Sequence, residues 1–400
     1  MQEEVNFRYT AQHKNYDEGE VVEILRASPQ RITPRCPHFG VCGGCSLQHL
    51  DPQAQLEHKQ QILIENLERI GNIYGVDMLP AIAGPLWGYR RRARLGVKYV
   101  LKKEALLVGF REKKSGLLAE LHRCEVLHPA VGEKLIALRT LISGLKSYQR
   151  IPQVEVAMGD TTTALVFRHL EALCASDRDQ LAHFGRQHDI AIYLQPNGPD
   201  TVTPLWPEAP QLSYHLPAWQ VELHFRPTDF TQVNSEINQQ MVGTALRLLD
   251  PQPEEEILDL FCGLGNFTLP LARLAKRVTG VEGSADLVTR ARENSQLNGI
   301  TNTDFFTFDL VGDSRQAPWS QRRYAKVLID PPRTGAFEVM ALLPKLAPSR
   351  VVYVSCNPAT LARDAGALVH RHGYRLVNAG VLDMFPHTTH VESIALFERN

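Results

Sequence analysis

A cysteine follows directly on an apolar run near the end of the sequence. Cys356 ends the run VVYVSC, and Asn357 and Pro358 separate it from a segment with the pattern of a helix. The positive end of a helix that begins near Ala359 favours the thiolate, which is the nucleophilic form of cysteine. Most cysteines at strand ends are nevertheless small core residues. This stretch therefore leaves two interpretations open, a thiol held for chemistry and a core side chain.

A glycine-rich turn earlier in the sequence indicates a cofactor site. The segment EEEILDLFCGLGNFTLPLA combines a buried strand, the turn and a helix start, and Glu282 ends the next strand-like run. Parallel sheets bind ligands where their strands end, and glycines let the backbone approach them. A dinucleotide site needs a third glycine, but Asn266 and two larger residues follow Gly265 here. The pattern D-x-F-x-G-x-G from Asp259 resembles the first motif of class I S-adenosylmethionine methyltransferases. A tight turn without a ligand is the alternative.

The residues after a later buried run, YAKVLID, indicate which atom accepts a methyl group. Asp330 opens the motif DPP, and Arg333 follows it in place of the aromatic residue usual in amino-group methyltransferases. An acceptor other than an amine is therefore expected. Carbon 5 of a uracil fits, because thiolate addition to carbon 6 makes it nucleophilic and a carboxylate then removes its proton. Cys356 and Glu392, which opens the run ESIALF, supply these two groups.

The elements that must position these residues form an alternating pattern from about residue 229. Strand-like runs alternate there with helical segments, which predicts a parallel sheet covered on both faces. Residues 90–228 contain strand-like runs with few long helices and predict a mostly antiparallel sheet. Residues 3–27 predict a hairpin, residues 31–50 a loop that needs an external staple, and residues 53–71 a helix.

Length and composition are those of a globular protein with two or three domains. The 400 residues are 44% hydrophobic and 22% charged, with a formal net charge of -1. The sequence has no signal-peptide core and no run of about eighteen apolar residues, so we expect a cytoplasmic protein without a membrane partner. The seven cysteines are then expected as ligands, nucleophiles or core residues, because the cytosol keeps thiols reduced.

One stretch is strongly basic although the whole chain is not. Between Trp87 and Gly116 there are ten Lys or Arg and two Glu, a surplus of eight positive charges in thirty residues. Trp87, Tyr89 and Tyr99 lie within this stretch. Flat rings beside arginines are typical of sites that hold bases swung out of an RNA stack. A solvated, charged strand is the alternative.

Six motifs together resemble one protein family. They are CPHFGVCGGC, WGYRRRARL, DFTQVN, DLFCGLGNFTLPLA, VSCNPATLARD and LDMFPHTTHVES, and they extend from Pro34 over nearly the whole chain. By these motifs the sequence is identified as a member of the RNA uracil-C5 methyltransferases, and within them of the RlmD (RumA) family. The resemblance implies methylation of carbon 5 of a uracil of 23S ribosomal RNA, at position 1939. We expect a monomer whose partner is this RNA.

The resemblance also implies which residues form the sites. Cys356 is implied as the nucleophile and Glu392 as the base. Asp309 stands where close relatives have Asn. The implied contacts to S-adenosylmethionine are Gln232, Phe261, Asn266, Glu282, Asp309 and Asp330.

A set of cysteines is explained by the same resemblance. Three have the spacing C-x5-C-x2-C, and a fourth lies in HRCEVL. Four thiolates suit tetrahedral zinc as well as an iron–sulfur cube, so the residues alone leave both open. The resemblance favours a 4Fe–4S cluster that staples the loop. Cys174 and Cys262 match neither a ligand nor a nucleophile, and we interpret both as core residues. The implied cluster ligands are Cys36, Cys42, Cys45 and Cys124.

Together these observations predict an α/β protein in three parts. Residues 1–30 are expected as a remnant of the RNA-binding TRAM domain, an OB-like barrel of which the last two strands are present. Residues 31–228 are expected as a mostly antiparallel α+β central domain with the iron–sulfur loop. Residues 229–400 are expected as a class I, Rossmann-like S-adenosylmethionine methyltransferase domain. Other functions stay open: the same chemistry on transfer RNA or another 23S uracil, and a non-catalytic RNA-binding or assembly factor.

Overall fold

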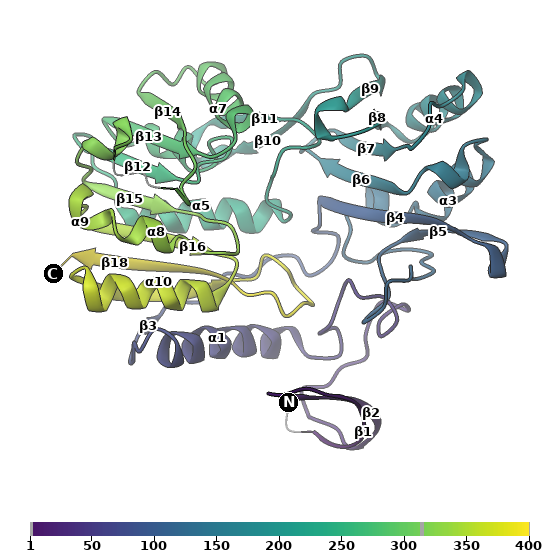
Figure 1. Ribbon diagram of the computed structural model, residues 1–400, viewed down its shortest axis with the longest axis horizontal. Helices are drawn as coiled ribbons and strands as arrows, with labels where there is room; N and C mark the ends of the chain where they lie inside the picture. The colour runs from purple at the N-terminus through teal and green to yellow at the C-terminus, as the bar shows by residue number, and fades with distance from the viewer. Residues whose placement is uncertain (1–2, 313–315, 400) are drawn as a thin grey trace.

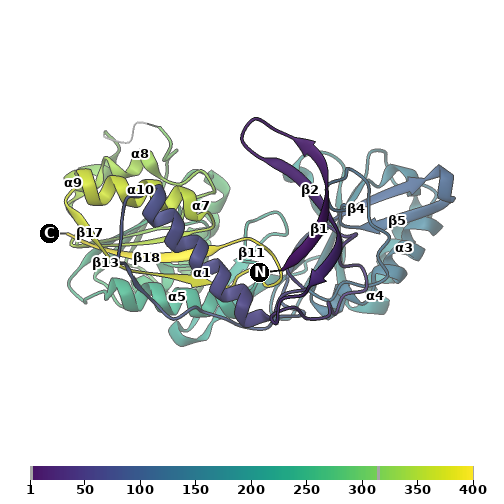
Figure 2. The same cartoon turned by 90° about the horizontal axis from the view of Figure 1, so that it is seen from below.

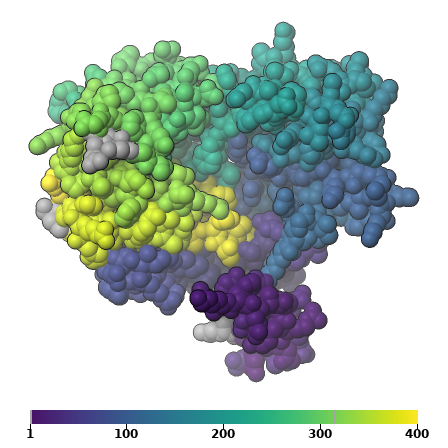
Figure 3. All heavy atoms as spheres, in the orientation of Figure 1, coloured from purple at the N-terminus to yellow at the C-terminus, as the bar shows by residue number. Residues whose placement is uncertain are grey.

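The computed structural model describes residues 3–312 and 316–399. Two bodies, each built on a β-sheet, lie side by side, and a hairpin from the beginning of the chain projects from them (Figure 1, Figure 3). Within the described ranges, no helix is both long enough and apolar enough to span a membrane.

The larger sheet has eight strands. They are β3 (Asp77–Met78), β12 (Glu256–Leu260), β13 (Arg277–Glu282), β14 (Thr303–Thr307), β15 (Lys326–Ile329), β16 (Arg350–Ser355), β17 (Tyr374–Leu382) and β18 (Glu392–Arg399). Their order is β14-β13-β12-β15-β16-β18-β17-β3. Strand β18 runs antiparallel to both of its neighbours, whereas the other pairs are parallel. The α/β class predicted from the alternation of strands and helices is confirmed.

Helices cover both faces of this sheet because its strands are apolar on both sides. They are α1 (Pro52–Arg69), α5 (Ser235–Leu249), α6 (Thr268–Ala272), α7 (Ala285–Leu297), α8 (Phe337–Met340), α9 (Leu343–Leu346) and α10 (Pro358–Arg371). Val351 and Tyr353 of β16 belong to the core formed with α1, α8, α9 and α10. Val352 and Val354 belong to the core formed with α5, α6 and α7 on the opposite face. Figure 2 shows α1 lying along the face that α10 also covers.

The smaller sheet has six strands in the order β5-β4-β6-β7-β8-β9. They are β4 (Arg92–Val100), β5 (Ala105–Gly109), β6 (Gln153–Met158), β7 (Thr163–Arg168), β8 (Ile190–Gln195) and β9 (Thr203–Trp206), with helices α2 (Pro129–Gly132), α3 (Leu135–Gly144) and α4 (Ala175–His188). The predicted, mostly antiparallel sheet is confirmed. Strands β7 and β8 are the parallel exception, and α4 provides the crossover that a parallel pair needs.

Two elements from the predicted central domain lie with the larger sheet instead. Helix α1 packs against α10 and β17, and β3 pairs with β17. The helix predicted over 53–71 is α1, and Asp51 caps it by accepting hydrogen bonds from the amides of Gln53 and Ala54. The domain limits 1–30, 31–228 and 229–400 stay a prediction, because α1 and β3 belong to the range 31–228 but pack with the larger sheet.

Two hairpins complete the fold. The predicted hairpin is β1 (Glu4–Gln12) with β2 (Asp17–Arg26), and a second one is β10 (Leu212–Leu216) with β11 (Val221–Phe225). Short 3-10 helices lie at Leu101–Lys103, Tyr148–Arg150, Pro199–Thr201, Pro217–Trp219 and Pro318–Gln321.

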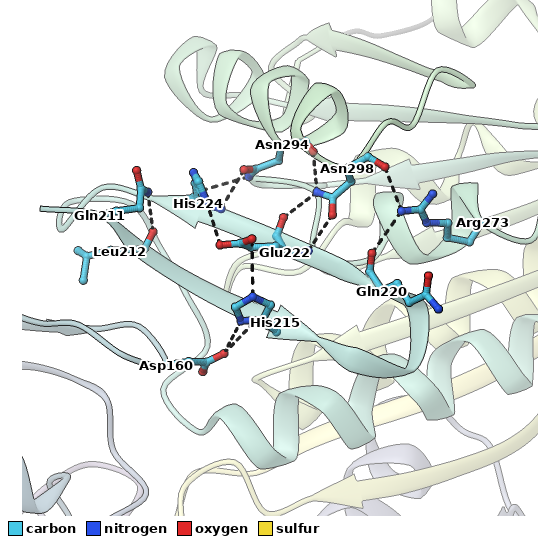
Figure 4. Close-up of polar contacts among 10 residues, drawn as sticks. All are labelled: Asp160, Gln211, Leu212, His215, Gln220, Glu222, His224, Arg273, Asn294 and Asn298. Carbon is cyan, nitrogen blue, oxygen red and sulfur yellow. Dashed lines mark hydrogen bonds and ion pairs between the residues drawn. The ribbon is translucent and has the colours of Figure 1, made fainter. Parts of the chain in front are cut away.

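Helix α7 holds the free edge of the second hairpin (Figure 4). Asn294 accepts from the amide of His224 at 2.9 Å and donates to its carbonyl at 3.1 Å. Asn298 accepts from the amide of Glu222 at 2.8 Å and donates to its carbonyl at 2.7 Å. Two side-chain amides, one helical turn apart, thus take the place of a neighbouring strand.

Candidate active site

Strand pairing brings the predicted nucleophile and the predicted base together. Ser355, the last residue of β16, pairs with Ser393 of β18, and Ser393 Oγ donates to Ser355 O at 3.2 Å. In an antiparallel pair the next residue of one strand faces the previous residue of the other, so Cys356 lies beside Glu392. Leu382 of β17 flanks Glu392 on its other side. The thiol and the carboxyl group therefore share the edge of the sheet where β12 and β15 also end.

Burial raises the pKa of every acid in this group. The side chain of Glu392 is buried, which raises its pKa to about 8, with a further increase from Asp330 and a decrease from Arg333. Burial also raises the pKa of Asp330 to about 7. Burial, followed by the charges of Glu392 and Asp330, raises the pKa of Cys356 to about 11 against the effect of Arg333. Burial and the two neighbouring acids therefore oppose the thiolate of Cys356 in the free protein, and its predicted activation by the end of α10 stays a prediction.

Helix α10 begins at Pro358, two residues after the thiol and close to where it was predicted. Asn357 caps it: Oδ1 accepts from the amide of Ala359 at 3.1 Å, and Nδ2 donates to Arg333 O at 3.1 Å. The exposed guanidinium of Arg333 lies 3.3 Å from His390 Nδ1. The loop after the DPP motif is thereby tied to the helix end, and a positive charge stands at the rim of the site.

The glycine-rich turn follows β12 and has a backbone that few residues adopt. Phe261, Gly263 and Gly265 have φ angles of 64°, 55° and 97°. Glu282, at the end of β13, accepts hydrogen bonds from Gly263 N at 3.2 Å and, with its other oxygen, from Ser284 N at 2.9 Å. The residue predicted to bind ribose hydroxyls therefore lies at the turn.

Asn266 lies half-buried at the same turn and contacts two residues that the sequence did not single out. Its Oδ1 accepts from Tyr214 Oη at 2.9 Å and from Asn238 Nδ2 at 3.0 Å, and its Nδ2 donates to Asn238 Oδ1 at 2.9 Å. Tyr214 comes from β10 and Asn238 from α5, so three distant segments converge here. The sequence could have indicated Asn238, because it is a polar residue beside the apolar Ile237 and Met241 on the buried face of α5.

The remaining predicted donor contacts differ in their exposure. Gln232 is half-buried in the segment before α5, which is joined to the basic stretch by a hydrogen bond from Arg91 N to Val233 O at 2.9 Å. Asp309 is exposed beyond the end of β14, and its carboxylate accepts from Val311 N at 3.0 Å. Contact of these residues with a methyl donor stays a prediction.

The four cysteines of the predicted cluster line one pocket. Burial raises the pKa of Cys45 to about 12 and that of Cys124 to about 11. Gly44 N donates to Cys42 Sγ at 3.4 Å. Within the ranges that the structure describes, no three His, Cys, Asp or Glu side chains are grouped as the ligands of a single metal ion.

The two cysteines outside these sites differ from each other. Cys262 is buried in the core, as predicted. The prediction that Cys174 is a core residue is wrong, because Cys174 is exposed and precedes the first turn of α4 at the surface. An apolar neighbourhood in the sequence did not distinguish a helix start from a strand here.

The basic stretch divides into a half-buried part and an exposed part. Arg91 forms an ion pair with Asp160 at 2.5 Å, and Arg92 donates to the backbone carbonyl of Asp229. These two cations therefore hold the protein together rather than face solvent. The exposed cations follow them and are Arg94, Lys98, Lys102, Lys103, Arg111, Lys113 and Lys114.

The aromatic residues of the same stretch are mostly engaged inside the protein. Tyr89 is 5% exposed and donates its hydroxyl to Pro386 O at 3.1 Å, so stacking of its ring on an RNA base is excluded. Trp87 is stacked on His387, with ring centroids 4.0 Å apart. Tyr99 is half-buried with its ring edge against another tyrosine.

Comparisons with known proteins relate this geometry to a family. Residues 211–400 match the family model described as tRNA (Uracil-5-)-methyltransferase. The 23S rRNA (uracil(1939)-C(5))-methyltransferase RlmD of Xanthomonas campestris pv. campestris (strain 8004) is 53% identical over 390 residues, which are 98% of this chain and 88% of the relative. The chain belongs to the RlmD family of uracil-C5 methyltransferases. The family identified from the sequence motifs is confirmed.

Two more relatives show how far the resemblance extends. The RlmD of Methylococcus capsulatus (strain ATCC 33009 / NCIMB 11132 / Bath) is 54% identical over 398 residues, 99% of this chain and 90% of the relative. The structure of the tRNA (uracil-54, C5)-methyltransferase of Pyrococcus abyssi in complex with S-adenosyl-L-homocysteine is similar with a TM-score of 0.74 and 25% identity, over 98% of this chain and 91% of that one. The predicted methyltransferase fold is confirmed, and this member of the RlmD family is an enzyme.

Proposed function

We propose that this enzyme transfers the methyl group of S-adenosylmethionine to carbon 5 of uracil 1939 in 23S ribosomal RNA. The observation that carries the proposal is the strand register that sets Cys356 beside Glu392, at the same sheet edge as the glycine-rich turn. Relatives named for this reaction are 53% and 54% identical to the chain. The transfer-RNA enzyme of similar fold is 25% identical, which favours ribosomal over transfer RNA.

The reaction needs a bond to sulfur that forms and later breaks. The Cys356 thiol loses its proton and Sγ bonds to carbon 6 of the uracil, which converts the ring to an enolate with a nucleophilic carbon 5. Carbon 5 then takes the methyl group from the sulfonium, and the electron pair of the broken bond stays on the sulfur of the departing S-adenosylhomocysteine. Glu392 removes the proton that carbon 5 still carries, and the pair of that bond forms the double bond between carbons 5 and 6. The bond between sulfur and carbon 6 breaks, and its electron pair returns to sulfur. One proton is released for each methyl group transferred.

The raised pKa values suit this sequence of proton transfers. A carboxyl group with a pKa of about 8 is close to the neutral pH at which a general base works best. The thiol of Cys356, with a pKa of about 11, is mostly protonated in the free enzyme. Arg333 is the nearby cation that lowers this pKa. S-adenosylmethionine supplies the methyl group on a positively charged sulfonium, and a positive charge beside Cys356 favours the thiolate.

The turn after β12 has the shape that a bound nucleoside needs. A side chain at Gly263 would face open space, so the backbone is accessible to a ligand there. Glu282 lies at this turn and offers its carboxylate oxygens to ribose hydroxyls. Asn266 is held in place by Tyr214 and Asn238. We propose that the donor is bound by the six residues Gln232, Phe261, Asn266, Glu282, Asp309 and Asp330.

We propose that the four clustered cysteines hold a 4Fe–4S cluster. Their thiol side chains line one pocket, and backbone amides are directed at the sulfurs: Gly44 N toward Cys42, and the amides of Leu127 and Val126 toward Cys124. Such amides are typical of iron–sulfur sites, where they stabilise the charge of the cluster. A cube sets each thiolate on a different iron, so the sulfurs need not meet around one ion. The bound cluster would fix the loop 36–45 to the residues around Cys124.

We propose that the RNA is held by the exposed cations between Arg94 and Lys114 and by the N-terminal hairpin. Phe7 and Tyr9 of β1 are 52% and 60% exposed, and Arg8 lies between them. Flat rings and a guanidinium on an exposed strand are suited to RNA bases and phosphates. The hairpin is in our proposal what remains of a TRAM domain.

The proposed chemistry is tested by trapping RNA on the enzyme. We expect Cys356→Ala to abolish methylation of 23S ribosomal RNA and to form no covalent complex. Glu392→Gln should form a protein–RNA complex that survives denaturation, because the sulfur cannot leave until the carbon 5 proton is removed. Cys174→Ala is the matched control and should turn over like the wild type. Turnover by Cys356→Ala would rule out the covalent route, and a Glu392→Gln enzyme that releases methylated RNA would exclude this residue as the base.

The cluster is tested separately by composition and colour. We expect the purified wild type to be brown with four irons and four sulfides per chain, and Cys124→Ser to lose both the colour and part of the stability. Cys174→Ser controls for the loss of any thiol. A colourless wild type that contains one zinc per chain would refute the cluster.

A further inference from the structure

Segment 383–391 joins β17 to β18 and leads directly to Glu392. Three consecutive carbonyl oxygens of this segment accept hydrogen bonds from three separate parts of the chain. The bonds run from Lys59 Nζ to Phe385 O at 3.0 Å, from Tyr89 Oη to Pro386 O at 3.1 Å, and from the amides of Ser46 and Leu47 to His387 O at 2.8 and 2.9 Å. A loop between two strands is normally free to move. This one is fixed at every position over three residues.

One of these contacts, that of Lys59, comes from a buried ion pair. The side chain of Lys59 on α1 is 1% exposed and that of Asp383 is 3% exposed, and Lys59 Nζ lies 2.6 Å from Asp383 Oδ1. Taking two charges out of water costs free energy that their attraction often does not recover, so an apolar pair of similar volume is commonly as stable. A contribution to fold stability therefore gives little reason for charges at these positions. What the ammonium adds is the directed bond to Phe385 O.

The N-terminal half of helix α1 supplies the side chains that make these contacts. Its buried stripe consists of Gln55, Lys59, Leu63 and Leu67, each one turn after the last. Leu63 and Leu67 pack in the core of the large sheet. Gln55 accepts from the amide of His387 at 2.9 Å, and its Nε2 lies 3.3 Å from His387 Nδ1. The polar half of the stripe thus faces the segment before Glu392, and the apolar half anchors the helix.

The backbone of the segment is strained where these contacts meet. His387 has a φ of 65°, in the left-handed region that residues with a side chain seldom adopt. Its ring is stacked on Trp87 with centroids 4.0 Å apart. Strain of this kind persists when the surroundings over-determine the conformation, and it clusters at functional sites.

We infer that Lys59, paired with Asp383, is a positioning residue that fixes segment 383–391 so that the Glu392 carboxylate meets the carbon 5 proton of the bound uracil. The inference rests on the proposed function. Lys59 does not touch the reacting atoms. It acts through the segment that precedes the base and that also carries Phe385 and His390, whose rings lie 5.4 Å apart. Its loss should slow proton removal more than formation of the bond between Cys356 and the uracil.

The test replaces the ion pair without leaving a single buried charge. The holoenzyme variant Lys59→Met/Asp383→Leu should retain the wild-type melting temperature within a few degrees, because the apolar pair fills the same space. We expect kcat to fall about tenfold or more, since small misplacements of a catalytic group have effects of this size. KM for S-adenosylmethionine should change by less than about twofold. The fraction of RNA held as covalent complex at steady state should rise, as it does when the base is slow. Leu63→Met, one turn along α1, is the control for repacking of the helix.

A second variant keeps the test decisive if the double variant folds poorly. Tyr89→Phe removes the bond to Pro386 O alone and should produce the same rise in trapped complex on a smaller scale. Normal kcat and a normal trapped fraction in either folded variant, in an enzyme whose wild type methylates uracil, would overturn the inference. A wild type that forms no complex with RNA would instead overturn the proposed function.

Discussion

The protonation of Glu392 is a property of the folded protein with a consequence for stability. Its pKa is about 8 in the fold and 4.5 in the unfolded chain. Between these values the unfolded chain has lost the proton and the folded chain has kept it, so the free energy of unfolding falls as pH rises from about 4.5 to about 8. We expect Glu392→Gln to be more stable than the wild type by a few kcal/mol above pH 8, because one pKa unit is worth about 1.4 kcal/mol. Below pH 4.5 the two proteins should be equally stable.

Urea unfolding of the two proteins at several pH values measures this difference. Glu208→Gln, at an exposed glutamate in a loop, is the control for the Glu-to-Gln change itself. A constant difference between Glu392→Gln and the wild type from pH 5 to pH 9 would contradict the raised pKa.

At the scale of the residue, the sequence indicated which side chains to propose for the site, but it did not predict their pKa values or their exposure. Cys356 and Glu392 were identified because each stands at an end of an apolar run. The raised pKa of Cys356 was not predicted, because it depends first on burial and then on Glu392 and Asp330, which come close only through strand pairing. A local sequence pattern does not show which acids lie near Cys356 in the fold. The exposure of Cys174 was missed for a related reason, since burial is decided by the packing of the whole element.

At the scale of the element, one residue both starts α10 and ties it to the loop after the DPP motif. We expect Asn357→Ala to lower stability by about 1 kcal/mol through loss of the N-cap and to reduce kcat through release of the Arg333 loop. Asn357→Ser should restore the cap and hence the stability, but its short side chain does not reach Arg333 O, so kcat should stay reduced. Thermal unfolding and single-turnover methylation separate the two effects. Recovery of both in Asn357→Ser would show that the cap alone matters.

The elements themselves were largely predictable, and their pairing was not. Periodicity predicted α1, the antiparallel sheet and the alternating strands and helices of the larger body. It did not predict that α1 leaves its sequence neighbours to cover the larger sheet. The polar residues Gln55 and Lys59 on the buried stripe of α1 indicated that this helix has a partner outside its sequence neighbours. A polar residue on an apolar face has a partner elsewhere in the chain, but the sequence does not name the partner.

At the scale of the molecule, the second hairpin connects the smaller body to the helices of the larger sheet. On one side Asp160, in the turn between β6 and β7, accepts from the amide of His215 at 2.8 Å. On the other side Asn294 pairs with the backbone of His224 (Figure 4). The hairpin also places Tyr214 on Asn266. Interactions across such distances in the sequence are beyond the reach of pattern analysis.

We expect Asn294→Ala to destabilise the protein by about 1–3 kcal/mol, because Asn294 is fully buried and its loss leaves the buried carbonyl of Leu264 and the half-buried backbone of His224 without this partner. Asn298→Ala should cost less, since Asn298 is only half-buried and water can replace its amide. Chemical denaturation gives both values. No measurable loss of stability in Asn294→Ala would mean that these side chains do not serve as the missing strand.

Strand β18 lies between β16 and β17 although it follows both in the chain. During synthesis, β16 and β17 therefore cannot be joined in one sheet until residues 392–399 have been made and β18 pairs with both of them. Cys356, the proposed nucleophile, is therefore synthesised before Glu392, the proposed base. We expect a chain that is broken off before residue 392 to lack both the proposed base and the strand that joins β16 to β17. The late position of β18 in the sequence thus couples closure of the larger sheet to the arrival of Glu392, the proposed base.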